Sequence, residues 1–322
     1  RHRLAADYRL TERNLVLVSD VDTALGEIAA RTDGPLILFS PSATTHALKS
    51  ASSHRNVVEV GRGPGRDGMI SLDAASDLPH DGLAVIASPG DPLGNLLAAN
   101  DAVRLARSCA WLIIDERYAE YAGQSLLNVA SEFSNVIVLR SFQARLGVTE
   151  ATAGWVAGST RARDLLSGIS TPMSPGIAEA LLASYASGPS GRMLLALIRD
   201  ERSRLYRALR KLSFLQPLPS WGPFVAARVE VGDRDQLLAL LGANGIRVHA
   251  PQEPGLERYI RIGIGLRSSM EYLRQSLLDI APEMLGAQLA SGRRDPYRLT
   301  LRSEEFGQPD VRQVEERGKR SA

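Results

Sequence analysis

The chain has 322 residues, of which 44% are hydrophobic, enough for one large domain with a buried core and a smaller companion domain. Its 38 basic residues nearly balance its 36 acidic ones, so the charge gives no reason to expect nucleic acid as a partner. The single cysteine, Cys109, excludes an internal disulfide, and we expect a buried thiol in a reducing, cytoplasmic setting.

No apolar run approaches the roughly 18 residues of a membrane-spanning helix, and no signal-peptide pattern opens the chain, so we expect no membrane contact. The sequence begins at Arg1 rather than at methionine, which we interpret as a fragment or a processed chain. The five histidines show no metal-ligand spacing, so we expect no metal.

Short apolar runs alternate with longer amphipathic stretches over residues 1–190, which is the pattern of a large α/β domain. Several runs are apolar on both faces, which favours a mainly parallel central sheet with helices on both faces. The expected strands are 15–18, 35–39, 56–60, 83–87, 111–114, 136–139 and 153–157. The expected helices are 21–31, 44–52, 94–108, 125–132, 161–167 and 177–186.

Apolar residues then recur at helical spacing over 191–213, which predicts a long connecting helix. Residues 214–286 read as a small C-terminal α+β domain. Its expected strands are 224–230 and 259–264, and its expected helices are 233–244, closed by Gly245, and 269–280. Residues 287–322 are rich in arginine, glutamate and glutamine and are expected to form a polar, mobile tail.

Four segments of the sequence are informative when they are taken together. Three follow expected strands of the large domain, and one lies in the small domain. They are Ser88-Pro89-Gly90-Asp91-Pro92-Leu93-Gly94, Asp115-Glu116-Arg117-Tyr118, Ser141-Phe142-Gln143-Ala144-Arg145-Leu146-Gly147 with Gly154-Trp155, and Tyr259-Ile260-Arg261-Ile262-Gly263. In this order and spacing they resemble class I/II aminotransferases of the fold-type I pyridoxal-phosphate group, and most of all the histidinol-phosphate aminotransferase branch. The resemblance covers most of residues 10–285.

The resemblance implies a role for each matching residue. Asp115 would pair with the pyridine nitrogen of pyridoxal phosphate, and Tyr118 would hold the ring oxygen. Asp91 stands where the family has an asparagine that donates to that oxygen, and Ser141 opens the segment that holds the cofactor. Arg261 matches the arginine that grips the α-carboxylate of the amino-acid substrate.

The same segments depart from the family at the cofactor. Ala144 stands at the position of the Schiff-base lysine, and the guanidinium of the neighbouring Arg145 cannot form an imine. Thr152 stands at the phosphate-binding arginine and Gln143 at a serine. The stretch Ser19-Asp20-Val21-Asp22-Thr23, where the family cradles the phosphate, adds negative charge.

These departures favour a pseudoenzyme that lacks covalently bound cofactor and serves as a small-molecule-binding or interaction module, with a small carboxylate as a possible ligand. One alternative is an active transaminase or decarboxylase of amino acids or amino-acid phosphates, although Lys49 and Lys211 are poorly placed to replace the missing lysine. Another is non-covalent acid–base chemistry by Asp91, Asp115 and Tyr118, with His249 or Arg261.

The family resemblance also implies a homodimer or pairing with an active homologue, although the N-terminal arm of the family has no counterpart before Arg1. The glycine-rich segment Gly61-Arg62-Gly63-Pro64-Gly65-Arg66 contains proline and opens no obvious helix. We therefore interpret it as a flexible connection rather than a phosphate cradle.

Overall fold

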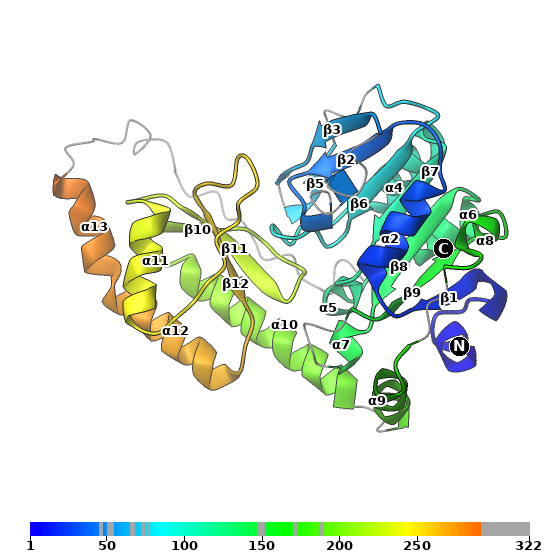
Figure 1. Ribbon diagram of the computed structural model, residues 1–322. Coiled ribbons are helices and arrows are strands. Elements are labelled where there is room, and N and C mark those ends of the chain that lie inside the picture. The colour runs from blue at the N-terminus through cyan, green and yellow to red at the C-terminus, as the bar shows by residue number, and fades with distance from the viewer. Residues whose placement is uncertain are drawn as a thin grey trace.

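The apolar runs of the first half of the chain form one seven-stranded sheet in the computed structural model (Figure 1). The described residues are 1–44, 48–49, 55–64, 68–72, 75, 77–146, 152–169, 173–186 and 190–290. The strands are β1 (Leu15–Val18), β2 (Leu36–Ser40), β3 (Val57–Gly61), β6 (Leu83–Ala87), β7 (Trp111–Asp115), β8 (Val136–Ser141) and β9 (Gly154–Gly158), in the order β1-β9-β8-β7-β6-β2-β3.

Strands β8, β7, β6, β2 and β3 pair in parallel, and β9 runs antiparallel to both β8 and β1. The expected mainly parallel sheet is therefore confirmed. Its central strands are buried on both faces, as in β6 and β8, where every residue is buried. The carboxyl ends of the five parallel strands meet at one edge of the sheet, which is where ligands bind in open α/β sheets.

Helices cover both faces of this sheet. On one face, α2 (Val21–Ala30) and α8 (Ala162–Leu166) bury apolar side chains against β2, β6 and β8. On the other, α4 (Ala99–Ser108) and α6 (Leu127–Glu132) pack against a second apolar cluster that includes the fully buried Trp155. Cys109 lies in this second cluster, which confirms the expected buried thiol. The shorter elements of this half are α1 (His2–Asp7), η1 (Glu12–Asn14), α5 (Ala119–Ala122), α7 (Gln143–Leu146) and α9 (Pro175–Ala186).

The predicted connecting helix is α10 (Ser190–Leu209), which leads from the large domain into a small one (Figure 1). The small domain has an antiparallel sheet of β10 (Leu215–Pro217), β11 (Phe224–Val229) and β12 (Tyr259–Gly263). It is packed with α11 (Arg234–Ala243), α12 (Arg267–Asp279) and α13 (Ala281–Ala290) around its own apolar core. Helix α13 continues into the first residues of the expected polar tail, whose remainder lies outside the described residues.

Two sequence predictions need correction. The helix expected over 94–108 begins only at Ala99, because Gly94 adopts a left-handed φ of 78° and Leu96 forms an isolated β-bridge with Met69. The prediction of a flexible connection at Gly61 to Arg66 is wrong for its first part: Arg62 is buried, and β4 (Gly63–Pro64) pairs with β5 (Ile70–Ser71). The expected helix over 44–52 falls largely outside the described residues.

Candidate functional site

The site predicted from sequence lies at the carboxyl ends of the parallel strands. Asp115 ends β7, Ser141 ends β8, and Asp91 lies in the turn after β6. Tyr118 immediately precedes α5, and Arg261 reaches the site from β12 of the small domain. The structure therefore brings Asp91, Tyr118 and Arg261 into direct contact but joins Asp115 to a different set of partners.

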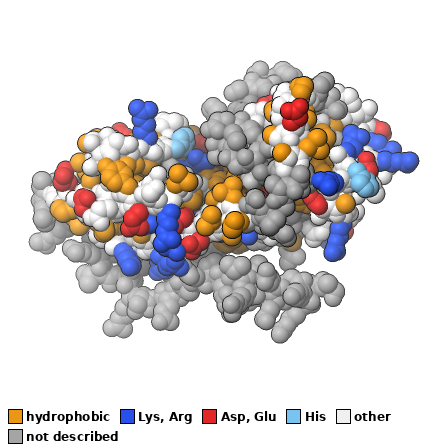
Figure 2. Space-filling view, turned by 90° about the horizontal axis from the view of Figure 1, so that it is seen from below, with side chains coloured by type: hydrophobic (Ala, Val, Ile, Leu, Met, Phe, Trp, Pro, Cys, Tyr) orange, Lys and Arg blue, Asp and Glu red, His pale blue; other side chains and the backbone are white. Residues whose placement is uncertain are grey.

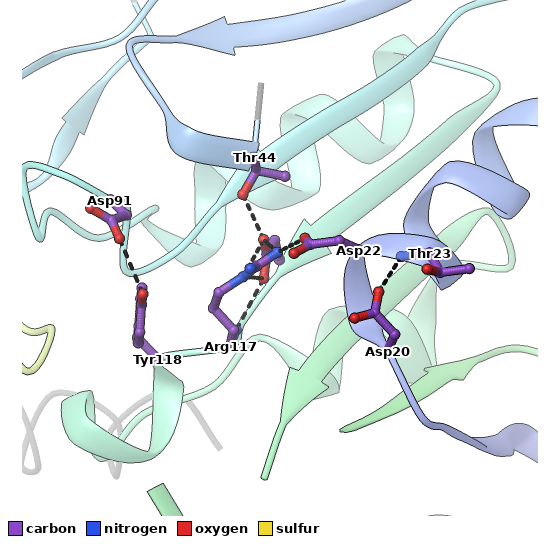
Figure 3. Close-up of polar contacts among 8 residues, drawn as sticks. Asp20, Asp22, Thr23, Thr44, Asp91, Arg117 and Tyr118 are labelled. Carbon is purple, nitrogen blue, oxygen red and sulfur yellow. Dashed lines mark hydrogen bonds and ion pairs between the residues drawn. The ribbon is translucent and has the colours of Figure 1, made fainter. Parts of the chain in front are cut away.

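Asp115 is completely buried and is held by partners from within the chain. Two of these partners, Thr44 and Arg117, are labelled in Figure 3. Thr44 Oγ1 donates to its Oδ2 at 2.6 Å, and Arg117 Nε donates to Oδ2 at 2.9 Å and to Oδ1 at 3.1 Å. Arg117 Nη2 also reaches Asp22 Oδ1 at 2.7 Å, at the start of α2. Although burial alone would lower the pKa of Arg117, these two carboxylates raise it above its usual range, so the guanidinium stays charged.

This contact changes what Asp115 can do. The resemblance assigns its carboxylate to a protonated pyridine nitrogen, which is a cation and a hydrogen-bond donor. Here the cationic Arg117 and the hydroxyl of Thr44 already supply the charge and the donors. The resemblance matches residues 115–118 to a family block Asp-Glu-Ala-Tyr, in which alanine stands at the position of Arg117. The departure is therefore visible in the sequence, but the direction of the Arg117 side chain is not.

Arg261 is engaged in the same way. Its Nη2 donates to Asp91 Oδ2 at 3.1 Å, and its Nε lies at ion-pair distance, 3.0 Å, from Asp91 Oδ1 without forming a second hydrogen bond. The guanidinium carbon also lies 4.0 Å from the centre of the Phe224 ring. Asp91 thus pairs with the guanidinium that the resemblance assigns to a substrate carboxylate.

Tyr118 completes this cluster by donating its hydroxyl to Asp91 Oδ2 at 3.1 Å (Figure 3). Burial raises the pKa of Tyr118 well above its ordinary value, and the negative charge of Asp91 raises it further. The phenol is therefore neutral at physiological pH and acts as a donor. His249 pairs with Arg261 through backbone hydrogen bonds of 3.1 and 2.8 Å, and its side chain is exposed.

The position that the resemblance assigns to the Schiff-base lysine, Ala144, lies in the short helix α7. Ala144 is 1% exposed, and Gln143 donates its backbone N–H to Ser141 Oγ at 3.1 Å. Two lysines belong to the described residues, and neither lies in this cluster: Lys49 pairs with Glu59 on β3, and Lys211 follows α10.

The N-terminus of α2 carries its own carboxylate. Asp20 accepts a hydrogen bond from Thr23 N at 2.6 Å as the N-cap, and Thr152 Oγ1 donates to the carbonyl of Ser19 at 3.1 Å. Burial alone would raise the pKa of Asp20, but the hydrogen bonds from Thr23 and Thr152 lower it below its usual value. A carboxylate therefore satisfies helix donors at the place that the resemblance assigns to the phosphate.

A buried ion pair that was not predicted from the sequence lies next to Asp115, at the carboxyl end of β7. Arg140 Nη1 donates to Glu116 Oε2 at 2.8 Å, and Ser125 Oγ donates to the same oxygen at 2.6 Å. Both charged side chains are almost fully buried, and Arg140 also lies over the rings of Tyr8 and Trp155. Burial raises the pKa of Glu116 despite the neighbouring Arg140. Glu116 is next to Asp115, so this pair fixes the end of β7.

The described residues contain neither a cluster of metal-binding side chains nor a helix suited to crossing a membrane. Among them, no group of three histidine, cysteine, aspartate or glutamate side chains is arranged to hold a metal ion. None of the described helices combines the length and the apolar character needed to cross a membrane. On the face seen in Figure 2, acidic and basic side chains of the described residues lie among one another.

Comparison with known proteins agrees with this architecture. The family model for aminotransferase class I and II matches residues 69–277, more than half of the chain. A histidinol-phosphate aminotransferase from Dehalococcoides mccartyi is 29% identical over 223 residues, covering 69% of this chain but only 62% of that relative. One from Thermococcus gammatolerans is 27% identical over 91% of this chain and 82% of its own length.

Solved structures show the same fold. The crystal structure of histidinol-phosphate aminotransferase from Sinorhizobium meliloti, in complex with pyridoxal-5'-phosphate, superposes with a TM-score of 0.73 at 22% identity. The match covers 88% of this chain and 80% of that one. The family model, the relatives and the mainly parallel sheet lead to one conclusion: the chain belongs to the class I and II aminotransferase family.

Proposed function

We propose that this chain is an aminotransferase-like protein that forms no Schiff base with pyridoxal phosphate and serves as a small-molecule-binding or interaction module. The observation that carries the proposal is the burial of Ala144, whose methyl group stands at the position that the resemblance assigns to the Schiff-base lysine. A methyl group offers no amine for an imine, and no lysine of the described residues lies near it.

Pyridoxal phosphate is the cofactor of the family, and the residues present do not fit its covalent attachment. Asp115 is paired with Arg117, Arg261 is paired with Asp91, and Asp20 caps the helix that would face the phosphate. A phosphate dianion beside Asp20 would meet a like charge, which costs about 4 kcal/mol at ~4 Å and an effective dielectric near 20. We therefore derive no reaction step through this cofactor.

The test is a spectrum of the protein with and without added pyridoxal phosphate, followed by borohydride reduction and peptide mapping. The chain contains only Lys49, Lys211 and Lys319, so each possible adduct can be assigned. We expect no one-to-one near-ultraviolet or violet band and only scattered labelling of these lysines. A variant with all three changed to arginine is the matched control.

A stoichiometric adduct that a single lysine-to-arginine change abolishes would contradict the proposal. So would transfer of an amino group from any member of a donor panel to a keto acid, because that is the activity of a transaminase. Carbon dioxide release from the same panel would instead identify a decarboxylase.

We also propose a homodimer, or pairing with an active homologue, in a cytoplasmic setting. Large apolar side chains stand exposed on α9 and α10, with Leu182 65%, Met193 67% and Leu197 59% exposed. Large apolar side chains in such exposed positions on two consecutive helices support a surface that another protein covers.

A further inference from the structure

Three buried polar side chains carry hydrogen-bond donors that no described residue satisfies. They are Ser42 Oγ, Asn95 Nδ2, and both Nε and Nη1 of Arg62. Each of these residues is 2–3% exposed. Buried donors in native proteins are almost always paired with protein, water or ligand, so this concentration of unpaired donors calls for a partner.

The donors belong to three neighbouring strands of the sheet. Arg62 directly follows β3, Ser42 follows β2, and Asn95 lies in the turn after β6, and β2 is the middle strand of the three. Arg62 Nη2 donates to Asn95 Oδ1 at 2.9 Å, and the backbone N–H of Arg62 donates to the Ser40 carbonyl at 2.7 Å. The three side chains therefore share the edge of the sheet where ligands bind in α/β folds.

The chain leaves space for this arrangement at Gly90. A Cβ at this position would lie 2.0 Å from Arg62 Nη2 and 2.8 Å from Asn95 Oδ1, so any other residue would displace the guanidinium. Ala43 N also donates to the Asp91 carbonyl at 3.1 Å, which ties the turn after β2 to the turn after β6. The position of Arg62 is thus fixed by the backbone around it.

Arg62 carries a charge that its neighbours do not neutralise by direct pairing. Burial lowers its pKa to about 10, while the charges of Asp115 and Asp91 act in the opposite sense, so it is protonated at neutral pH. Those two carboxylates are themselves held by Arg117 and Arg261. A buried cation without a bonded anion is costly, so an anion is the favoured partner.

We propose that Arg62, Asn95 and Ser42 form a binding site for the carboxylate of a small organic acid. A monoanion fits better than a phosphate dianion, because the fields of Asp91 and Asp115 oppose a second negative charge. The site is separate from Arg261, which Asp91 occupies, and it does not depend on Ala144 or on the proposed function. An ordered water cluster is the competing explanation of the same donors.

The experiment measures binding of acetate and formate to the full chain by saturation-transfer NMR and by thermal shift, with chloride holding the ionic strength constant. Inorganic phosphate is the second arm. We expect saturable binding of the carboxylates and weaker binding of phosphate. Ser42→Ala is expected to bind acetate roughly tenfold more weakly, the effect of losing one hydrogen bond to a charged group. Arg62→Met is expected to abolish binding.

Arg228→Met is the matched control, since Arg228 is an exposed arginine on β11 and its loss should leave acetate binding unchanged. If Arg62→Met fails to fold, the weakening of acetate binding in Ser42→Ala is the measurement that tests the proposal. The proposal is overturned by an absence of saturable binding, which assigns the donors to water, or by equal binding in the wild type and Ser42→Ala. It is also overturned if phosphate binds as tightly as acetate, or if Arg261→Met rather than Arg62→Met abolishes acetate binding.

Discussion

The pairing of Asp91 with Arg261 joins the two domains and should contribute measurably to stability. The two side chains are 20% and 22% exposed, so solvent screens them only in part. At ~4 Å and an effective dielectric near 20, the charges attract by about 4 kcal/mol, most of which offsets their desolvation. Hydrogen bonds between charged groups retain about 1.5–3 kcal/mol, which is the coupling energy we expect.

A double-mutant cycle measures this coupling. The wild type, Asp91→Asn, Arg261→Met and the double variant are unfolded in urea, with circular dichroism and tryptophan fluorescence recorded together to check for a single transition. The control cycle uses Arg228 and Glu230, a single 3.2 Å contact between side chains that are 44% and 35% exposed. That pair should couple by only about 0–1 kcal/mol.

A coupling between Asp91 and Arg261 below about 0.5 kcal/mol, or no larger than that of the control pair, would refute the reasoning. It would mean that Arg261 is available to an external carboxylate.

Four further outcomes are expected. Burial raises the pKa of Cys109 to about 12, so Ellman's reagent should react with it only after unfolding; rapid reaction of the native protein would contradict its burial. Tyr118 keeps its proton in the folded state above its ordinary pKa of 10.0, so its contribution to stability is complete below pH 10 and is lost as pH rises further. Replacing it with phenylalanine should flatten the alkaline fall in melting temperature. Glutamate at Met193 and Leu197 should reduce the mass found by light scattering if α10 forms the dimer surface. Ala144→Lys alone should give no absorbance band of bound pyridoxal phosphate, because Arg117, Asp91 and Asp20 would still occupy the contacts that the cofactor and substrate need. A full band in this variant would show that the missing lysine alone prevents covalent binding of the cofactor.

The sheet could be predicted from sequence because its strands are short apolar runs, buried on both faces and separated by amphipathic helices. The strand β6 (Leu83–Ala87) is identical to the prediction, and β7 and β8 are longer by one and two residues. The errors come from backbone details. Gly94 takes a left-handed conformation that delays α4, and β4 pairs with β5 where the glycines suggested a loop.

The sequence predicted which residues belong to the site, but not which of their side chains bond to one another. Asp91 and Arg261 lie 170 residues apart, and nothing in either segment indicates that the two side chains bond to each other. Arg117 was visible as a departure from the family block, but its bond to Asp115 depends on the direction of its side chain. The burial of Arg62 depends on the missing side chain of Gly90, a relation between two turns that only the fold reveals.

The three internal contacts share one physical logic. A charged side chain that is buried without a partner costs several kcal/mol, so a chain without its ligand must either lose that residue or provide a counter-charge. Here Asp115 pairs with the cationic Arg117, whereas the resemblance implies that it would pair with the protonated pyridine nitrogen of the cofactor. Arg261 pairs with the carboxylate of Asp91, whereas the resemblance implies that it would bind the carboxylate of a substrate. At the N-terminus of α2, the carboxylate of Asp20 accepts a hydrogen bond from the backbone, whereas the resemblance implies that the cofactor phosphate would lie there.

In each of the three contacts, the internal group has the same sign of charge as the cofactor or substrate group whose place it takes. A random loss of function would not require this match of charge. Ala144 then belongs to a set of matched changes, and restoring its amine would leave three internal competitors bound at the same contacts. An external ligand of this site must either displace those competitors or use the donors that they leave open. Among the described residues at this end of the sheet, those donors belong to Arg62, Asn95 and Ser42, and to the Nε of Arg261.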